Sequence, residues 1–565
     1  MSSRARLGAL AFAAAALMQP ALGQIESAGL DDVDSWGVSF LARGEKSFSD
    51  RLWLGSDGDY LQELLMQLDI ASMTEPEQAV LSRALRSPTI GPDGDAAADL
   101  ANARLDLLLL MGHQREAATL ARQMEEVPEG FDGDALVSDA RLASGELEIV
   151  CRQMDPAAEG AFWAQLRAIC TIEAEDYASA ELATEIAAQQ DGVEPWFSEV
   201  AIAMIGDIDD RPEARYGSGL EYALSGLAGL ELTEATVESA TPEIAATLAR
   251  DEELPYDIRL MAADKAAKAG LFSATEHRSI YKAMIAEPEF EPGSAIEAAF
   301  VVFARKPEPK PIVVATATGS GPRDLRSMNE DWIEPVQPEE ISDDALAIEA
   351  VDEISLEEEQ ALALSEALRQ AAASKDDFEI AARLFEPELA RLPVNEDTAA
   401  GALIFATASL VSGNEKGAIR WLDGLDADEL SDAEAFDAAL TKGYALILVG
   451  QRSSGLLSDV AERLIETGIE PRQQEQALRL FSLWSGFDMP MPVNARMALG
   501  GADFKTRRIP SGKLAAIEAA SRSGAPGEAL FALLSVTNGK PQQLSGADLQ
   551  TLMQVLGRLG AGGEA

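Results

Sequence analysis

The two cysteines are the residues whose type most directly raises the question of chemistry. Cys151 and Cys170 are the only cysteines of the 565-residue chain, and they flank the stretch CRQMDPAAEGAFWAQLRAIC. A redox pair typically has two intervening residues, not 18, and a catalytic thiol needs a base, while the nearest histidine in sequence is His113. We therefore predict a structural disulfide. Two buried helical thiols are the alternative, and thiol chemistry is a distant third.

The spacing of the cysteines makes this disulfide geometrically demanding. We expect Cys151 near the end of one helix and Cys170 near the end of the next, which starts around Gly160. In an antiparallel pair this places the two residues roughly 10 Å apart along the axis, at 1.5 Å per residue. A bridge needs Cα atoms about 4.4 to 6.8 Å apart. The segment DPAAEG would have to be extended, or the first helix would have to end early.

Several catalytic templates are only partly matched. Ser279 and Lys282 lie three apart, and Ser412 opens an SGN tripeptide, as in penicillin-binding sites, but the Lys-Thr-Gly strand is missing. The IES tripeptide at 25–27 is like the Glu-Ser of lytic transglycosylases, but no lysozyme-like pattern surrounds it. PSGK lacks the upstream glycine of a phosphate loop. We therefore assign no catalytic residue.

The sequence also contains no convincing pattern of metal-binding or cofactor-binding residues. The two histidines, His113 and His277, are far apart in sequence. Two groups of aspartates lie in acidic stretches, but neither has the glycine and glutamate positions of a calcium-binding EF-hand loop. These groups are Asp93, Asp95 and Asp99, and Asp426, Asp428 and Asp432. We expect no metal and no cofactor.

One cationic segment differs from the rest of the sequence. FKTRRIPSGK brings together Lys505, Arg507, Arg508 and Lys513 after the Met- and Pro-rich FDMPMPVNARMALGG. Such a segment on an acidic body is a candidate surface for an acidic partner or for the protein's own surface. The alternative is a loop whose charges only offset neighbouring acids.

The overall charge excludes some partners. The chain has 45 basic and 96 acidic residues, a net charge of −51, and 47% of its residues are hydrophobic. Such a surface repels phosphate backbones and anionic lipids, so we expect no nucleic-acid partner. The hydrophobic fraction indicates a folded protein with a large core rather than general disorder.

The first 23 residues have the plan of a secretory signal peptide. Arg4 and Arg6 precede an apolar run from Leu7 to Met18, and small residues follow at Ala21 and Gly23. As a helix this run would reach about 18 Å, too short for a hydrocarbon core of about 30 Å. We expect cleavage after Gly23, no membrane insertion afterwards, and a periplasmic protein.

Helical spacing dominates the rest of the chain. Apolar residues recur at i, i+3, i+4 and i+7, with few β-branched runs, so the predicted fold class is all-α. A turn residue is repeatedly followed, five positions later, by a small or apolar residue that opens such a stripe. These turn residues are Gly112, Gly145, Glu175, Gly413 and Gly524, and Gly450 precedes a stripe shifted to 457–464.

The turns are 30 to 37 residues apart where they are consecutive, and this period is typical of stacked helical hairpins. The turn glycine and the small residue five later resemble those of tetratricopeptide repeats (TPR), although the aromatic positions of that family's first helix are mostly absent. The resemblance implies an α-solenoid, a superhelical array of antiparallel hairpins. It implies nothing about the partner.

The N-terminal half also resembles a group of exported, alanine-rich helical proteins of Gram-negative bacteria. The stretches that carry this resemblance are SWGVSF, RLWLGSD, LRSPTI and AFWAQLRAIC. The group has no established activity, so no function is implied.

The helical pattern is interrupted at 306–344, which is rich in Pro, Gly and acids. We predict a disordered linker there, joining an N-terminal array at 24–305 to a C-terminal array at 345–565. The function that fits these features is an exported, non-enzymatic scaffold that binds a protein or peptide in the cell envelope. The alternative is a peptidoglycan-processing enzyme or an accessory of one. The sequence leaves the oligomeric state open.

Overall fold

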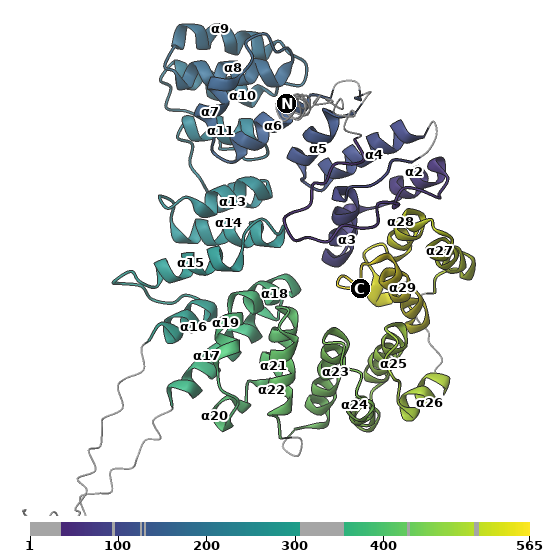
Figure 1. Cartoon of the computed structure of the whole chain (residues 1–565). Coiled ribbons are helices and arrows are strands. Elements are labelled where there is room, and N and C mark those ends of the chain that lie inside the picture. The colour runs from purple at the N-terminus through teal and green to yellow at the C-terminus, as the bar shows by residue number, and fades with distance from the viewer. Residues whose placement is uncertain are drawn as a thin grey trace, which may run out of the picture. The chain divides into compact units, whose positions relative to one another are not determined.

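The protein is all-α, as predicted from its sequence. A computed structural model describes residues 35–92, 96–124, 127–128, 131–305, 355–426, 430–501 and 508–565. These residues form α-helices and two short 3-10 helices, and no strand occurs among them (Figure 1). No helix within the described ranges is long and apolar enough to cross a membrane.

The helices fall into two compact units, and the first is assembled from both ends of the chain. It comprises residues up to 133 together with 516–539 and 559–564. Its helices are α2 (Gly58–Met66), η1 (Ile70–Ser72), α3 (Glu75–Arg86), α4 (Ala97–Leu110), α5 (Gln114–Ala121), the end of α27 (Ser511–Ser523) and α28 (Pro526–Thr537).

The second unit contains the remaining helices, from residue 134 to 515 and from 540 to 558. Its first part is α6 (Gly133–Ala143), α7 (Leu147–Gln153), α8 (Ala161–Glu173), α9 (Tyr177–Ala188), α10 (Pro195–Ile205), α11 (Gly219–Leu227), α12 (Glu234–Ser239), α13 (Pro242–Arg250), α14 (Tyr256–Lys268), α15 (Ala274–Met284) and α16 (Ala295–Ala304). Its second part is α17 (Leu356–Ala371), α18 (Lys375–Leu384), α19 (Glu386–Arg391), α20 (Glu396–Ala399), α21 (Ala402–Val411), α22 (Glu415–Asp423), α23 (Asp432–Leu448), α24 (Ser454–Thr467), α25 (Pro471–Gly486), α26 (Val493–Gly501), η3 (Pro541–Gln543) and α29 (Gly546–Leu559).

One backbone motif joins successive helices into hairpins. Between α21 and α22, Gly413 has φ +82°, its N–H donates to the carbonyl of Leu410, and the N–H of Asn414 donates to that of Ser409. This pair of bonds is a Schellman turn, which satisfies the carbonyls left over at a helix end. The predicted turn residues Gly112, Gly145, Glu175, Gly450 and Gly524 also have positive φ.

Small buried residues explain how closely the two helices of a hairpin approach. The residue five positions after the turn is fully buried at Ala117, Ala180, Ala418 and Ala529. A methyl side chain keeps the helix axes close, and larger residues of the same stripe, such as Trp421, fill the space beside it. The predicted stripes are therefore core residues.

Helix starts also follow local signals in the sequence. The Thr241 side chain accepts a hydrogen bond from Ile244 N, with Pro242 in the first turn, and Ser273 and Glu276 form a capping box, as their spacing predicts. A cap of this kind contributes roughly 1 kcal/mol, so these residues fix where each helix begins.

The predicted linker at 306–344 lies outside the described residues. The helices on either side of it, α16 and α17, pack against each other, and both contribute to one hydrophobic core. That core includes Phe300 from α16, Leu364 from α17 and Phe385 just after α18. The boundaries of the two compact units therefore differ from those of the two predicted arrays, because both sides of the predicted linker lie in the second unit. The superhelical arrangement remains a prediction.

Candidate functional site

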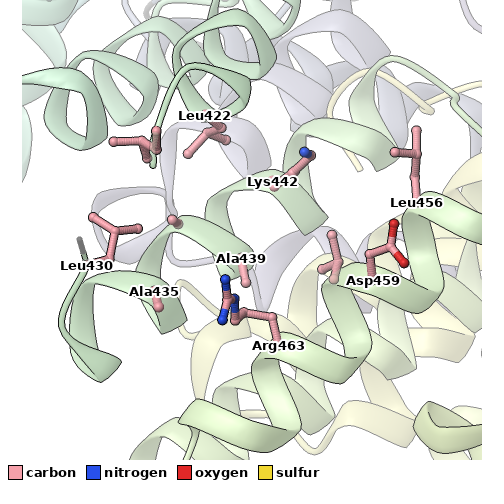
Figure 2. Close-up of a pocket in the computed structure, with 11 residues that line it drawn as sticks. Leu422, Leu430, Ala435, Ala439, Lys442, Leu456, Asp459 and Arg463 are labelled. Atoms are coloured by element: carbon pink, nitrogen blue, oxygen red, sulfur yellow. The ribbon is translucent and has the colours of Figure 1, made fainter. Parts of the chain in front are cut away.

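The most distinctive site in the second unit is a groove between the end of α22, α23 and α24 (Figure 2). Its volume is about 180 Å³. The floor is aliphatic, and three charged side chains lie at its edge. The lining residues are Leu422, Leu425, Leu430, Ala435, Ala438, Ala439, Lys442, Leu456, Asp459, Val460 and Arg463.

Helix geometry explains why these side chains share one face. On α24, Leu456, Val460 and Arg463 follow at intervals of four and three, so they lie one above the other. Leu457, Ala461 and Leu464 occupy the neighbouring face and are buried in the core. On α23 the lining residues include alanines such as Ala439. Because their side chains are small, a hollow remains between α23 and α24.

The charges of the groove are unequally satisfied. Lys442 Nζ lies 2.6 Å from Asp423 Oδ1, which forms an ion pair. The half-buried Arg463 guanidinium and the exposed Asp459 carboxylate form no hydrogen bond or ion pair with any residue that the structure describes, although they are one helical turn apart. The groove therefore combines an apolar floor with a guanidinium that has no ion-pair partner in the described part of the chain.

Sequence analysis missed this groove because its residues come from three helices. The predicted stripe at 457–464 marks the core face of α24, and the groove is lined by the adjacent face together with Val460, which also belongs to the core. The groove could have been predicted from the apolar residues on two adjacent faces of α24. A helix that packs only against the core needs apolar residues on a single face.

The predicted cationic segment is only partly described. Lys505 and Arg507 lie outside the described residues. Arg508 and Lys513 are exposed, and neither lines the groove. The next residue after Arg508, Ile509, is buried, and its N–H donates to Asp548 Oδ2 at 2.9 Å, which ties this end of the segment to α29.

Cys151 and Cys170 form a disulfide between α7 and α8, with Cα atoms 5.4 Å apart. The expected separation of the two cysteines along the helix axis is avoided because the connecting segment 154–160 is not helical. Arg167 Nη1 on α8 donates to the carbonyl of Ala158 at 2.7 Å, so this segment lies along α8. The end of α7 can thus sit beside the last turn of α8. The predicted disulfide is confirmed, and the alternative of two free thiols is excluded.

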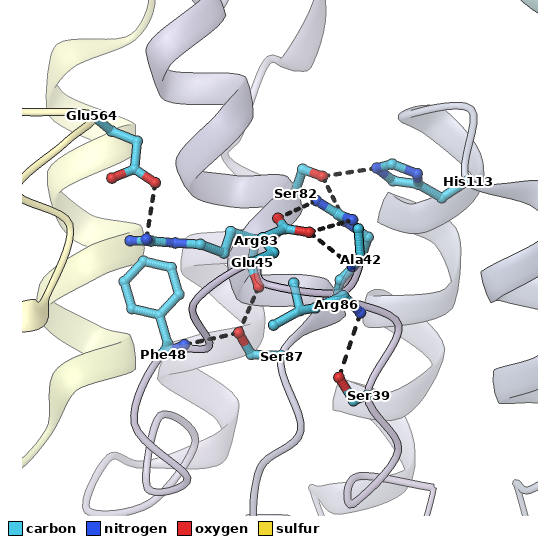
Figure 3. A network of polar contacts seen from close by, with 11 residues as sticks. Ser39, Ala42, Glu45, Phe48, Ser82, Arg83, Arg86, Ser87, His113 and Glu564 are labelled. Atoms are coloured by element: carbon cyan, nitrogen blue, oxygen red, sulfur yellow. Dashed lines mark hydrogen bonds and ion pairs between the residues drawn. The ribbon is translucent and has the colours of Figure 1, made fainter. Parts of the chain in front are cut away.

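In the first unit, Ser82 and His113 form a pair that is typical of a nucleophile and its base (Figure 3). Ser82 Oγ lies 2.8 Å from His113 Nε2. However, Arg86 Nε also donates to Ser82 Oγ at 3.0 Å, and Arg86 is held by Glu45 through a bond of 2.7 Å. Ser82 is 9% exposed. The buried Ser82 hydroxyl therefore connects α3 with His113, the residue before α5.

The same network continues through Arg83. Its guanidinium lies 4.1 Å from the ring centroid of Phe48 and pairs with Glu564 at 3.1 Å, while Ser87 Oγ accepts from Phe48 N at 2.9 Å (Figure 3). These contacts hold the segment before α2, helix α3 and the C-terminal residues together within the first unit.

The second histidine belongs to a buried stack in the second unit. The His277 ring stacks on Tyr281, and Tyr281 stacks on Phe300 with ring centroids 4.7 Å apart. His277 Nε2 lies 3.4 Å from Asp264 Oδ1 without forming a hydrogen bond. Burial lowers the pKa of His277 to about 4 and raises the pKa of Asp264 to about 6. The dominant species at neutral pH is therefore a neutral imidazole beside a carboxylate.

The two serines of the partly matched penicillin-binding template form hydrogen bonds to nearby backbone carbonyls. Ser279 Oγ donates to the carbonyl of Glu276, and Ser412 Oγ donates to that of Ser409, so each hydroxyl is bonded to its own chain segment. Of the acidic groups, Asp93, Asp95 and Asp428 lie outside the described residues. Among the residues that are described, no group of three or more His, Cys, Asp or Glu side chains could hold a metal ion.

No family model, no curated protein and no solved structure matches this chain. The resemblances to tetratricopeptide repeats and to exported alanine-rich proteins therefore rest on the sequence features given above.

Proposed function

We propose that this protein is an exported, non-enzymatic helical-repeat scaffold that binds a protein or an extended peptide in the cell envelope. The observation that carries the proposal is the groove between α22, α23 and α24, with its aliphatic floor and an Arg463 side chain that pairs with no described residue. An exposed apolar hollow with a few placed polar groups is typical of a binding site. Consecutive hairpins of a helical repeat form such hollows where neighbouring helices meet.

Two features support a location in the periplasm. The disulfide between Cys151 and Cys170 is of a kind that persists in oxidising compartments such as the bacterial periplasm. The signal-like pattern of the first 23 residues, which lie outside the described part of the chain, predicts export by itself.

The chemistry of the polar clusters supports a binding role over catalysis. Ser82 is buried at 9% exposure, and His277 is enclosed by aromatic rings. Neither group lines the groove. A catalytic base must reach its substrate, whereas a binding groove needs only shape and a few directed charges.

Site-specific photo-crosslinking in living cells tests this function. A photoreactive residue would replace Leu456 in the groove, Ile202 on α10 or Met66 on α2, one position at a time. Formation of a protein adduct of defined mass from any of these positions is the expected result. The absence of adducts from all three, together with muropeptide release by the pure protein, would instead support the alternative of a peptidoglycan-processing enzyme.

A further inference from the structure

We infer that the groove between α22, α23 and α24 takes an extended peptide segment that presents an aliphatic side chain beside a single carboxylate. This inference rests on the proposed function and specifies the chemistry of the partner. It is carried by three properties of the groove: its lining, its size and an Arg463 guanidinium that has no ion-pair partner among the described residues.

The lining selects aliphatic side chains. The floor consists of leucine, alanine and valine side chains, and no aromatic residue lines it. Burial of apolar surface is favourable in proportion to the area removed from water, so an entering leucine- or valine-type side chain stabilises the complex. Polar side chains would lose their hydration here without gaining a partner from the floor.

The size favours a side chain of a longer segment over an enclosed small molecule. Pockets that bury drug-sized ligands are typically about 300 to 1,000 Å³. This groove has about 180 Å³, and Asp459 at its edge is exposed. A chain that crosses the surface can insert one or two side chains into such a hollow while the rest of it remains in solvent.

The charge selects a carboxylate. Lys442 is paired with Asp423 at 2.6 Å, so Arg463 is the lining cation that lacks a counter-ion among the described residues. A guanidinium presents two parallel N–H donors, which match the two oxygens of a carboxylate. Asp459, one turn away on α24, is placed to accept a backbone N–H of the same segment.

The net charge of the protein limits the partner further. With a net charge of −51, the protein repels a strongly acidic peptide before it reaches Arg463. At physiological ionic strength salt screens this repulsion only beyond about 8 Å, so it still acts on acidic residues that lie close to the surface around Arg463. The segment that fits best is therefore neutral or cationic overall and carries one carboxylate next to its aliphatic residue.

Fluorescence anisotropy with designed peptides tests this inference. The probe is an acetylated and amidated peptide with Glu-Leu at its centre and Ala, Gly and Lys around it. Matched probes carry Gln-Leu or Glu-Ser instead. We expect the Glu-Leu peptide to bind tightest. Arg463→Gln should weaken its binding about tenfold, to the level of the Gln-Leu peptide, because charge-assisted hydrogen bonds are lost.

Two further variants separate binding from folding. Ala438→Leu places a larger side chain in the groove and should abolish binding of the Glu-Leu peptide. Arg496→Gln removes an exposed charge of α26 outside the groove and should leave binding unchanged. Thermal melting followed by circular dichroism confirms that all three variants are folded.

The outcomes separate this inference from the proposed function. Equal binding of the Glu-Leu and Gln-Leu peptides, or unchanged binding by the folded Arg463→Gln variant, would overturn the assignment of the carboxylate. If no probe binds, and the Arg463→Gln and Ala438→Leu proteins still form the cellular adducts, the groove is not the site and the scaffold function stands.

Discussion

The hairpin of α21 and α22 and the first compact unit use the same kinds of contact over very different sequence distances. In the hairpin, the rings of Phe405 and Trp421 have centroids 5.1 Å apart, and the Gly413 turn joins their helices. In the first unit, Trp53 and Phe531 also have centroids 5.1 Å apart, although they come from opposite ends of the chain.

Polar contacts also differ in sequence distance between the first unit and the hairpin of α21 and α22. Glu77 on α3 accepts hydrogen bonds from Thr537 Oγ1, 460 residues away, and from Gly539 N at 3.2 Å. In the hairpin, Asn414 at the start of α22 accepts from Gly417 N at 2.9 Å. A hairpin can therefore form from its own residues, whereas the first unit is complete only when α28 is in place. The following predictions test this difference, from the largest effect to the smallest.

Gly539→Ala should produce the largest loss of stability. A Cβ at this position would lie 1.7 Å from the Ser72 carbonyl oxygen, and φ is +69°, so the backbone must move and the contact with Glu77 is disturbed. We expect a loss of more than about 3 kcal/mol. Hydrogen exchange should show lost protection in α2 to α5 and retained protection in α21 and α22.

The matched control is Gly557→Ala in α29, where a Cβ meets nothing within 4 Å. It should be neutral or slightly stabilising, by about 0.5 kcal/mol, because alanine is the better helix former. An equal loss of protection in both units after Gly539→Ala would contradict the separate contribution of α28 to the first unit.

Removal of the disulfide should give the next largest effect. Replacing both Cys151 and Cys170 by Ser frees a loop with a sequence separation of 19 and should lower the free energy of unfolding by about 3 kcal/mol. Urea unfolding followed by fluorescence measures this change. The wild-type protein in reductant should match the variant, and identical curves for oxidised and reduced wild type would show that the bridge contributes no stability.

Gly413→Ala should have a smaller effect than Gly539→Ala, although both glycines have positive φ. A Cβ at Gly413 meets nothing within 4 Å, so only the left-handed backbone conformation opposes it. We expect a loss of about 1 kcal/mol in chemical unfolding. Gly455→Ala, inside α24, is the control and should not destabilise. A loss above 3 kcal/mol at Gly413 would mean that the turn has tertiary contacts as well.

The smallest effect concerns pH and the pair of Asp264 and His277. The pKa of Asp264 is raised to about 6, so its contribution to stability is present below its unfolded value of 3.8 and is lost as the pH rises through 6. The pKa of His277 is lowered to about 4, so its contribution is present above 6.5 and is lost as the pH falls through 4. The two dependences oppose each other across nearly the same range.

Asp264→Asn should remove this compensation. The variant should lose stability relative to the wild type between pH 6.5 and pH 4, by less than about 1 kcal/mol, because the Asp264 side chain is 48% exposed and solvent weakens its effect. Urea unfolding at pH 7.5, 6 and 5 measures the difference. Parallel pH profiles for the variant and the wild type would show that the two groups do not compensate each other.

Much of the helical pattern was predictable because its signals are local. The turn at Gly145, the cap at Thr241 and the buried stripe that begins at Ala418 each depend on residues within one or two helical turns. The disulfide was also predictable as a pairing, since the chain has only two cysteines. Its geometry was not, because the expected mismatch is relieved by the course of the segment 154–160 along α8.

The sequence by itself determined the all-α class, the repeated turns, the caps at Thr241 and Ser273 and the buried stripes that follow the turns, since helix propensity, left-handed turn residues and apolar periodicity act over a few residues. Only the tertiary structure decided that α28 completes the unit containing α3, and that Arg463 and Lys442 share one groove. The physical reason is that apolar periodicity shows which face of a helix is buried, whereas the element that covers this face depends on how distant helices pack in three dimensions.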